Sequence, residues 1–85
     1  MYRIVFSIQA SKAMLKMSRM SARLIRLKIE HVAEDPYAIH HNVKKLQGRP
    51  GYRLRVGDWR VIYEINNAEV MIIVMKNAAR GGVHR

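Results

Sequence analysis

Three arginines in the middle of the sequence have the residue type and spacing needed to hold a phosphate group. Arg53 and Arg55 lie in one alternating segment, and Arg60 lies in the next. Arginine suits phosphate because its planar guanidinium group donates paired hydrogen bonds to two oxygens. A positioned cation can also stabilise charge that develops on phosphorus, which is often the largest contribution to catalysis. These residue types therefore indicate the binding of an anionic ligand that carries phosphate.

Two predicted strands, residues 52–56 and 59–65, position these arginines. The Gly57-Asp58 pair between them is typical of a type II′ turn, and a two-residue hairpin fixes the register of its strands. Arg55 is then opposite Arg60, and alternation puts all three arginines on one face. The other face is apolar and predicts a core surface formed by Tyr52, Leu54, Val56, Trp59, Val61 and Tyr63.

The pairing of Arg55 with Arg60 is unusual, because like charges at opposed positions destabilise a strand pair. Arg53 adds a third positive charge nearby, and Glu64 further along the same face is a single carboxylate. One such arginine is best explained as a solvated surface residue. Three on one face of one hairpin favour an anionic ligand, whereas the stripe at positions 19, 23 and 26 is better explained as a solvated helix face.

The residues before the hairpin predict one strand and two helices. Residues 2–7 alternate with the period of a strand. Ser11 can cap a short helix that runs to about Arg19, with apolar contacts from Met14, Leu15 and Met17. Ser21 can cap a second helix that ends at Asp35-Pro36, because the residue before proline avoids helical angles. That helix has one apolar face, formed by Ala22, Ile25, Ile29, Val32 and Ala33 and widened by Leu24 and Leu27.

The remaining segments complete an α+β fold. Residues 37–47 are predicted as a polar, basic connection, and Arg49-Pro50-Gly51 marks a loop. Residues 70–75 are apolar at every position and predict a central strand covered on both faces. We therefore expect an N-terminal strand, a helix hairpin and an antiparallel three-strand meander that form one sheet with the helices on one face.

Length and charge limit the classes of protein. The 85 residues fit one domain, 1–85, and the absence of cysteine gives no sign of a disulfide-built domain. Sixteen Lys and Arg against six Asp and Glu give a net charge of +10, which opposes folding and is typical of proteins with a polyanionic partner. The sequence shows neither a signal peptide nor an apolar run of membrane-spanning length, so we expect a cytoplasmic protein that does not bind membranes.

With its residues in this order, the chain resembles the RelE/ParE superfamily of bacterial toxin–antitoxin toxins. The resemblance covers essentially the whole length and is strongest over Lys44–Gly48 and Tyr52–Ile65. The second segment matches the family's habitual gly-tyr-arg-leu-arg, a turn, and then tyr-arg-val-ile-tyr. The tail Arg80–Arg85 is similar to the family's C-terminal arg-x-x-val-tyr-arg, with His84 in the place of the tyrosine.

This resemblance implies a cofactor-free and metal-independent endoribonuclease that cuts mRNA in the ribosomal A site. It also implies a cognate acidic antitoxin that neutralises the toxin in a higher-order complex. Arg60 and Arg80 occupy positions that stabilise the scissile phosphate, and His84 occupies that of a proton carrier. The resemblance assigns substrate and phosphate binding to Lys44, Lys45, Arg53, Arg55 and Arg85.

Other residue combinations give weaker signals of a site. His31, Asp35, His40 and His41 do not have the spacing of a known metal site, so no metal ligand is predicted. Three classes of function stay open: a ribosome-dependent mRNA endonuclease, a ParE-like gyrase inhibitor, and a catalytically weakened relative that keeps antitoxin binding. Arg60, Arg80 and His84 together favour the first, whereas His84 in place of tyrosine keeps the third open.

Overall fold

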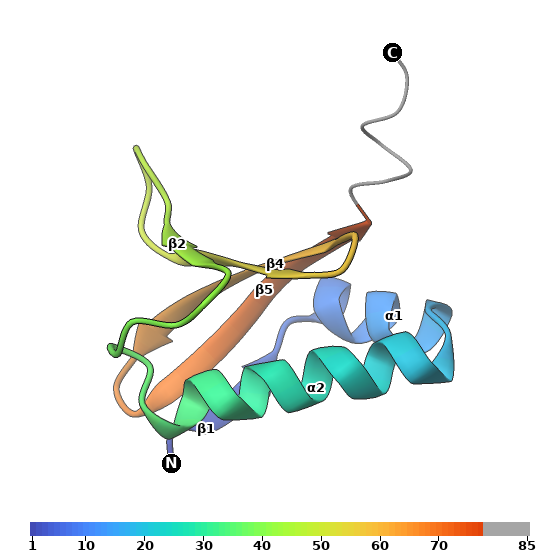
Figure 1. Ribbon diagram of the computed structural model, residues 1–85, viewed down its shortest axis with the longest axis horizontal. Helices are drawn as coiled ribbons and strands as arrows, with labels where there is room; N and C mark the ends of the chain where they lie inside the picture. Colours follow the sequence, from blue (N-terminus) through green and yellow to red (C-terminus); the bar gives the residue numbers. More distant parts are fainter. Residues whose placement is uncertain (78–85) are drawn as a thin grey trace.

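In the computed structural model, which describes residues 1–77, a five-stranded sheet is covered on one face by two helices (Figure 1). The strand order is β1-β5-β4-β3-β2, with β1 parallel to β5 and the other neighbours antiparallel. This arrangement confirms the predicted α+β class. In chain order the elements are β1 (Arg3–Phe6), α1 (Ile8–Lys16), α2 (Arg19–Glu34), β2 (Val43–Lys45), β3 (Tyr52–Val56), β4 (Trp59–Asn66) and β5 (Glu69–Asn77).

Both helices begin earlier than their predicted caps. Ser7 caps α1, since its Oγ accepts a hydrogen bond from the Ala10 backbone N–H at 3.0 Å, and Ser18 caps α2 by accepting from the Ser21 N–H at 3.1 Å. The predictions of Ser11 and Ser21 as caps were therefore wrong. Ser7 directly follows β1, so the chain turns into the helix at once and the predicted cap lies inside it.

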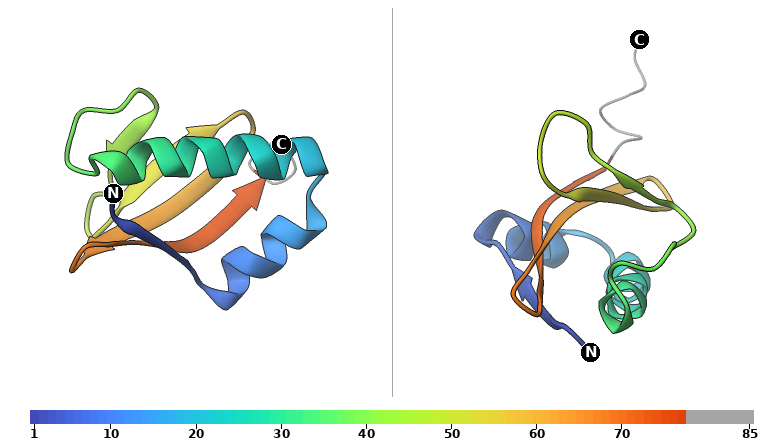
Figure 2. Two further views of the ribbon diagram at one scale, coloured as in Figure 1. Left: turned by 90° about the horizontal axis from the view of Figure 1, so that it is seen from below. Right: turned by 90° about the vertical axis from the view of Figure 1, so that its left-hand side faces the viewer.

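The core lies between α2 and the covered face of the sheet, and both helices lie on the same side of that sheet (Figure 2). Ile25 and Ile29 from α2 are fully buried, and burying each such side chain stabilises the fold by about 1.5–3 kcal/mol. Leu24 and Leu27 were expected to widen this apolar face, but they are 46% and 54% exposed. That expectation was wrong because only one stripe of α2 reaches the sheet. Leu15 of α1 is exposed in the same way.

Two predictions about the strands also need correction. The segment predicted as a polar connection contains β2, which pairs with β3 from Val43 to Lys45. The apolar run in β5 was expected to be covered on both faces. Val70 and Ile72 are buried beneath the helices, but Met71 lies on the opposite, open face and is only partly buried. Because both helices pack on one side, the described residues leave the other face of the sheet uncovered (Figure 2).

No helix within residues 1–77 has the length and apolarity needed to cross a membrane.

Candidate functional site

The β3–β4 hairpin has the predicted register. Arg55 is opposite Arg60, Leu54 is opposite Val61, and the turn residue Gly57 has a φ of +57°, as the first central position of a type II′ turn requires. The Arg55 N–H donates to the Asn42 carbonyl at 3.0 Å and therefore points toward β2, away from β4. Arg55 and Arg60 thus form a non-hydrogen-bonded pair, the type in which opposed Cα atoms are closest, at about 4.5 Å.

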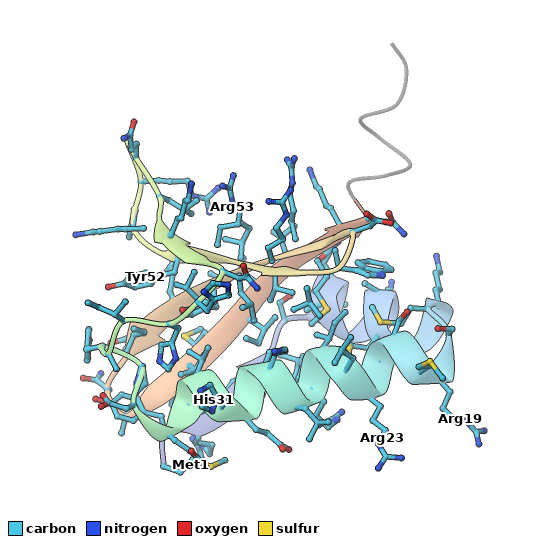
Figure 3. All side chains as sticks on the ribbon, in the orientation of Figure 1. Met1, Arg19, Arg23, His31, Tyr52 and Arg53 are labelled. Atoms are coloured by element: carbon cyan, nitrogen blue, oxygen red, sulfur yellow. The ribbon has the colours of Figure 1, made fainter. Side chains whose placement is uncertain are left out.

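Five cationic residues gather on the open face of the sheet. Lys44 is opposite Arg53, Arg55 is opposite Arg60, and Arg60 is opposite Lys76. Arg53 points away from both helices (Figure 3). We call the surface formed by these five residues the basic face. Within residues 1–77 the one salt bridge joins Arg3 to Glu69, so the basic face has no carboxylate partner in that range.

The other predicted binding residues do not all lie on the basic face. Lys45 is opposite Tyr52, so its side chain projects to the helix side of the sheet at the exposed edge, unlike Lys44. Both lysines nevertheless line one hollow of about 250 Å³ together with Arg53. Arg80, His84 and Arg85 lie outside the described residues.

Lys76 is a member of the basic face that sequence reasoning missed. Counting back from the turn after Asn66, an unbroken ladder would place Met75 opposite Arg60 and turn Lys76 toward the core side. A register shift at Ile62/Tyr63 leaves Ile73 as an extra residue in β5, and Lys76 then pairs with Arg60. The apolar run gives no signal for that bulge. The one indication in the sequence is the charge of Lys76 directly after the run, because a lysine is not expected to face the core.

The aromatic residues of the hairpin serve the core. Trp59 and Tyr52 pack against the buried cluster, and the Tyr52 and Tyr63 rings stack with their centroids 5.4 Å apart. Burial, with a smaller contribution from Tyr52, raises the pKa of Tyr63 from 10.0 to about 12. Tyr63 is 1% exposed, and its hydroxyl has no hydrogen-bond partner within residues 1–77. The Tyr63 ring is therefore not available for stacking on nucleobases, whereas Tyr52 and Trp59 are only partly buried against the core.

The histidines of the loop after α2 have a structural arrangement. His40 Nε2 lies 2.7 Å from the Asp35 carbonyl oxygen, and the His31 and His40 rings meet edge to face at 5.4 Å. These contacts tie the loop to the C-terminal end of α2. Within the described part of the chain, no group of three or more His, Cys, Asp or Glu side chains has the geometry to hold a metal ion.

A match to a family model identifies the family of this chain. The model for the ParE toxin of the type II toxin–antitoxin system parDE matches residues 4–76. The chain belongs to this family. The resemblance to the RelE/ParE superfamily drawn from the sequence is therefore confirmed. No curated protein sequence matches the chain significantly.

Solved structures agree with this placement among RelE/ParE toxins. A chain of the intact E. coli RelBE toxin–antitoxin complex is 25% identical, with a TM-score of 0.78 over 92% of this toxin and 98% of that chain. A chain of the archaeal RelE–RelB complex from Pyrococcus horikoshii OT3 is 28% identical, with a TM-score of 0.77 over 93% and 97%. The YoeB–YefM complex from Staphylococcus aureus, at 17% identity and a TM-score of 0.74, shares the fold.

Proposed function

We propose that this toxin is a metal-independent endoribonuclease that cuts mRNA on the ribosome and so inhibits translation in the cytoplasm. The observation that carries the proposal is the basic face. Five cations project from an uncovered sheet surface and have no carboxylate partner within residues 1–77. Like charges opposed across strands cost folding free energy, and a phosphodiester chain would offset that cost.

The proposed reaction uses the RNA's own 2′-hydroxyl. Its oxygen gives up its proton and attacks the adjacent phosphorus to form a 2′,3′-cyclic phosphate, the bond from phosphorus to the 5′-oxygen breaks, and the leaving 5′-oxygen takes up a proton. Arg60 and Arg80 stabilise charge on the scissile phosphate, and His84 transfers a proton near neutral pH. β5 ends at Asn77, which is opposite Trp59 at the start of β4, so the last described residues of the chain lie beside Arg60. Lys44, Lys45, Arg53, Arg55 and Arg85 bind the remaining phosphates.

A gyrase inhibitor is the second candidate function. It is favoured by the family model, whose description names the ParE toxin of parDE. In this alternative the basic face contacts gyrase or its DNA and performs no phosphodiester chemistry. The third candidate is a catalytically weakened toxin that binds only its antitoxin. It applies if His84 cannot replace the function of the tyrosine found in similar toxins.

The regulatory partner that we propose is an acidic antitoxin, bound in a higher-order complex. Residues 1–29 contain seven Lys and Arg and no Asp or Glu. The helices in this segment also expose large apolar side chains, among them Leu15 at 86% and Met20 at 81%. Exposed apolar residues between cations suit an amphipathic acidic segment that folds as it binds. The matched RelBE and RelE–RelB structures are toxin–antitoxin complexes, which supports such a partner here.

Two parallel assays separate the candidate functions. Primer extension on mRNA from a reconstituted translation system reports cleavage on the ribosome, and a supercoiling assay reports gyrase activity. We expect ribosome-dependent cuts from the wild type and a loss of about 100-fold or more in Arg60→Ala. Arg23→Ala is the matched control, because Arg23 projects from α2 on the far side from the basic face (Figure 3). Inhibition of gyrase without any mRNA cleavage would refute the nuclease proposal.

The antitoxin proposal has its own test. The toxin is co-expressed with small acidic proteins encoded beside it, and growth and co-purification are measured. We expect one of them to relieve toxicity and to raise the melting temperature of the toxin by mass action. If none binds the toxin or relieves its toxicity, the antitoxin proposal is wrong, whatever the outcome of the cleavage assay.

A further inference from the structure

The bulge in β5 decides which side of the sheet Lys76 faces. From Asn66–Glu69 to Tyr63–Ile72 the β4–β5 ladder is regular, and from Ile62–Val74 onward it is displaced by one residue. Since side chains alternate along a strand, a displacement of one residue turns every later side chain of β5 to the opposite face. Without the bulge Lys76 would lie on the helix side, near Trp59. With the bulge it joins the basic face.

Two side chains from the opposite edge of β5 hold this bulged segment. Ser7 Oγ donates to the carbonyl of Ile73, the extra residue, at 2.7 Å. The Gln9 side chain then makes the pair of hydrogen bonds to the β5 backbone that a neighbouring strand would otherwise make. Its Nε2 donates to the Met75 carbonyl at 3.2 Å, and its Oε1 accepts from the Met75 N–H at 3.1 Å. The backbone directly before Lys76 is therefore fixed on one side by Gln9 and on the other by pairing with β4.

The bulge produces a row of three cations across three adjacent strands. Arg55, Arg60 and Lys76 are consecutive register partners, and all three side chains are exposed. Neighbouring strands lie about 4.8 Å apart, so the row spans roughly 10 Å. Like charges at opposed positions destabilise the fold. Deletion of one residue in β5 would remove the bulge and turn Lys76 away from the other two cations. The bulge adds a third positive charge to this row at a cost in stability, which indicates an anionic ligand that binds the added charge.

We propose that Lys76 is a phosphate-binding residue of the basic face and that the Gln9-held bulge of β5 is the device that aims it. Its ligand is the sugar–phosphate backbone of single-stranded RNA, so the identity of the ligand rests on the proposed function. A lysine beside two arginines adds a compact charge with rotatable donors to two planar guanidinium groups. Gln9 touches no substrate in this proposal and acts as a positioning residue.

The test measures how RNA binding depends on salt. Fluorescence anisotropy of a short labelled single-stranded RNA gives the dissociation constant of the free toxin over a series of salt concentrations. Each phosphate contact contributes about 0.7 to the slope of log K against log salt for a single strand. We expect Lys76→Gln to reduce the slope by about 0.7, and Lys76→Arg to restore it. Lys12→Gln, which removes one exposed charge from α1, is the matched control and should leave the slope unchanged.

A second variant tests the aiming device. Gln9→Ala removes both hydrogen bonds to Met75 and leaves every charge in place. We expect it to weaken RNA binding in the wild-type background and to have no further effect in Lys76→Gln, since both changes remove the same contact. Additive effects of the two changes would contradict the positioning role of Gln9.

The outcomes separate this inference from the proposed function. Equal slopes for Lys76→Gln and Lys12→Gln would overturn the assignment of Lys76, even if the toxin cleaves mRNA. A wild-type toxin that does not bind single-stranded RNA would overturn both. A reduced slope in Lys76→Gln, together with no cleavage on the ribosome by the wild type, would keep Lys76 as a phosphate-binding residue and refute the nuclease.

Discussion

The buried hydroxyl of Tyr63 leads to a quantitative prediction about stability. The side chain is 1% exposed, and its hydroxyl finds no hydrogen-bond partner within residues 1–77. A buried polar group without a partner costs about 1–3 kcal/mol. Tyr63→Phe keeps the ring that stacks on Tyr52 and removes only this group. After a small loss of packing around the missing oxygen, we expect a net gain of about 1 kcal/mol, which raises the melting temperature by roughly 4–8 °C in a domain of this size.

The same hydroxyl also predicts how stability falls at alkaline pH. The pKa of Tyr63 is raised to about 12 in the folded protein, from 10.0 for an unperturbed tyrosine. Between these values the unfolded chain releases a proton that the folded chain retains, so the wild type loses stability as the pH rises. The loss approaches about 1.4 kcal/mol per pH unit, or roughly 2–3 kcal/mol in total. Tyr63→Phe cannot lose stability in this way, so its advantage over the wild type should widen above pH 10.

Thermal and urea unfolding of the two proteins at several pH values would measure both effects. Tyr37→Phe is the matched control, because Tyr37 is 67% exposed and keeps its ring contact with Tyr2 after the change. It should leave both stability and its pH dependence unaltered. A lower melting temperature for Tyr63→Phe, or a difference from the wild type that stays constant from neutral pH to pH 12, would show that the Tyr63 hydroxyl is satisfied.

Three further predictions concern the residues that shape the site. Ser7→Ala should cost about 1–2 kcal/mol, because it removes the cap of α1, whereas Ser11→Ala inside that helix should be neutral in urea unfolding. Gly51→Ala should destabilise the fold by more than about 1 kcal/mol, since φ is +113° and a Cβ would lie 2.9 Å from a backbone oxygen. Gly48→Ala should cost less, because the space around its Cβ is open. Unchanged stability in both variants would refute this account. Arg55→Ala should leave the melting temperature equal or slightly higher, because relief of the repulsion from the opposed arginine stabilises the fold by up to about 1 kcal/mol; a clear loss would mean that Arg55 is structural.

The sequence predicts most where one local signal determines the geometry. The Gly57-Asp58 turn fixes the register of its two strands, so the opposition of Arg55 and Arg60 follows from counting residues. A serine is a weaker signal, because Ser7 and Ser11 are equally good caps as residue types. The end of β1 decides between them, and that end depends on pairing with a strand far along the chain. The place of Lys76 depends on a bulge inside an unbroken apolar run, which residue counting cannot locate.

The parallel pairing of β1 with β5 has a consequence for the synthesis of the toxin. Arg3 is paired with Glu69, and Ser7 and Gln9 bond to residues that follow them by 66 positions. During synthesis β1 must therefore wait until β5, 66 positions later, has been made before its partner exists. Contacts of such long range delay folding, because the loop must close before any pairing offsets its entropy. A product that stops before β5 lacks the strand that joins β1 to β4, so an incompletely made toxin cannot assemble this sheet.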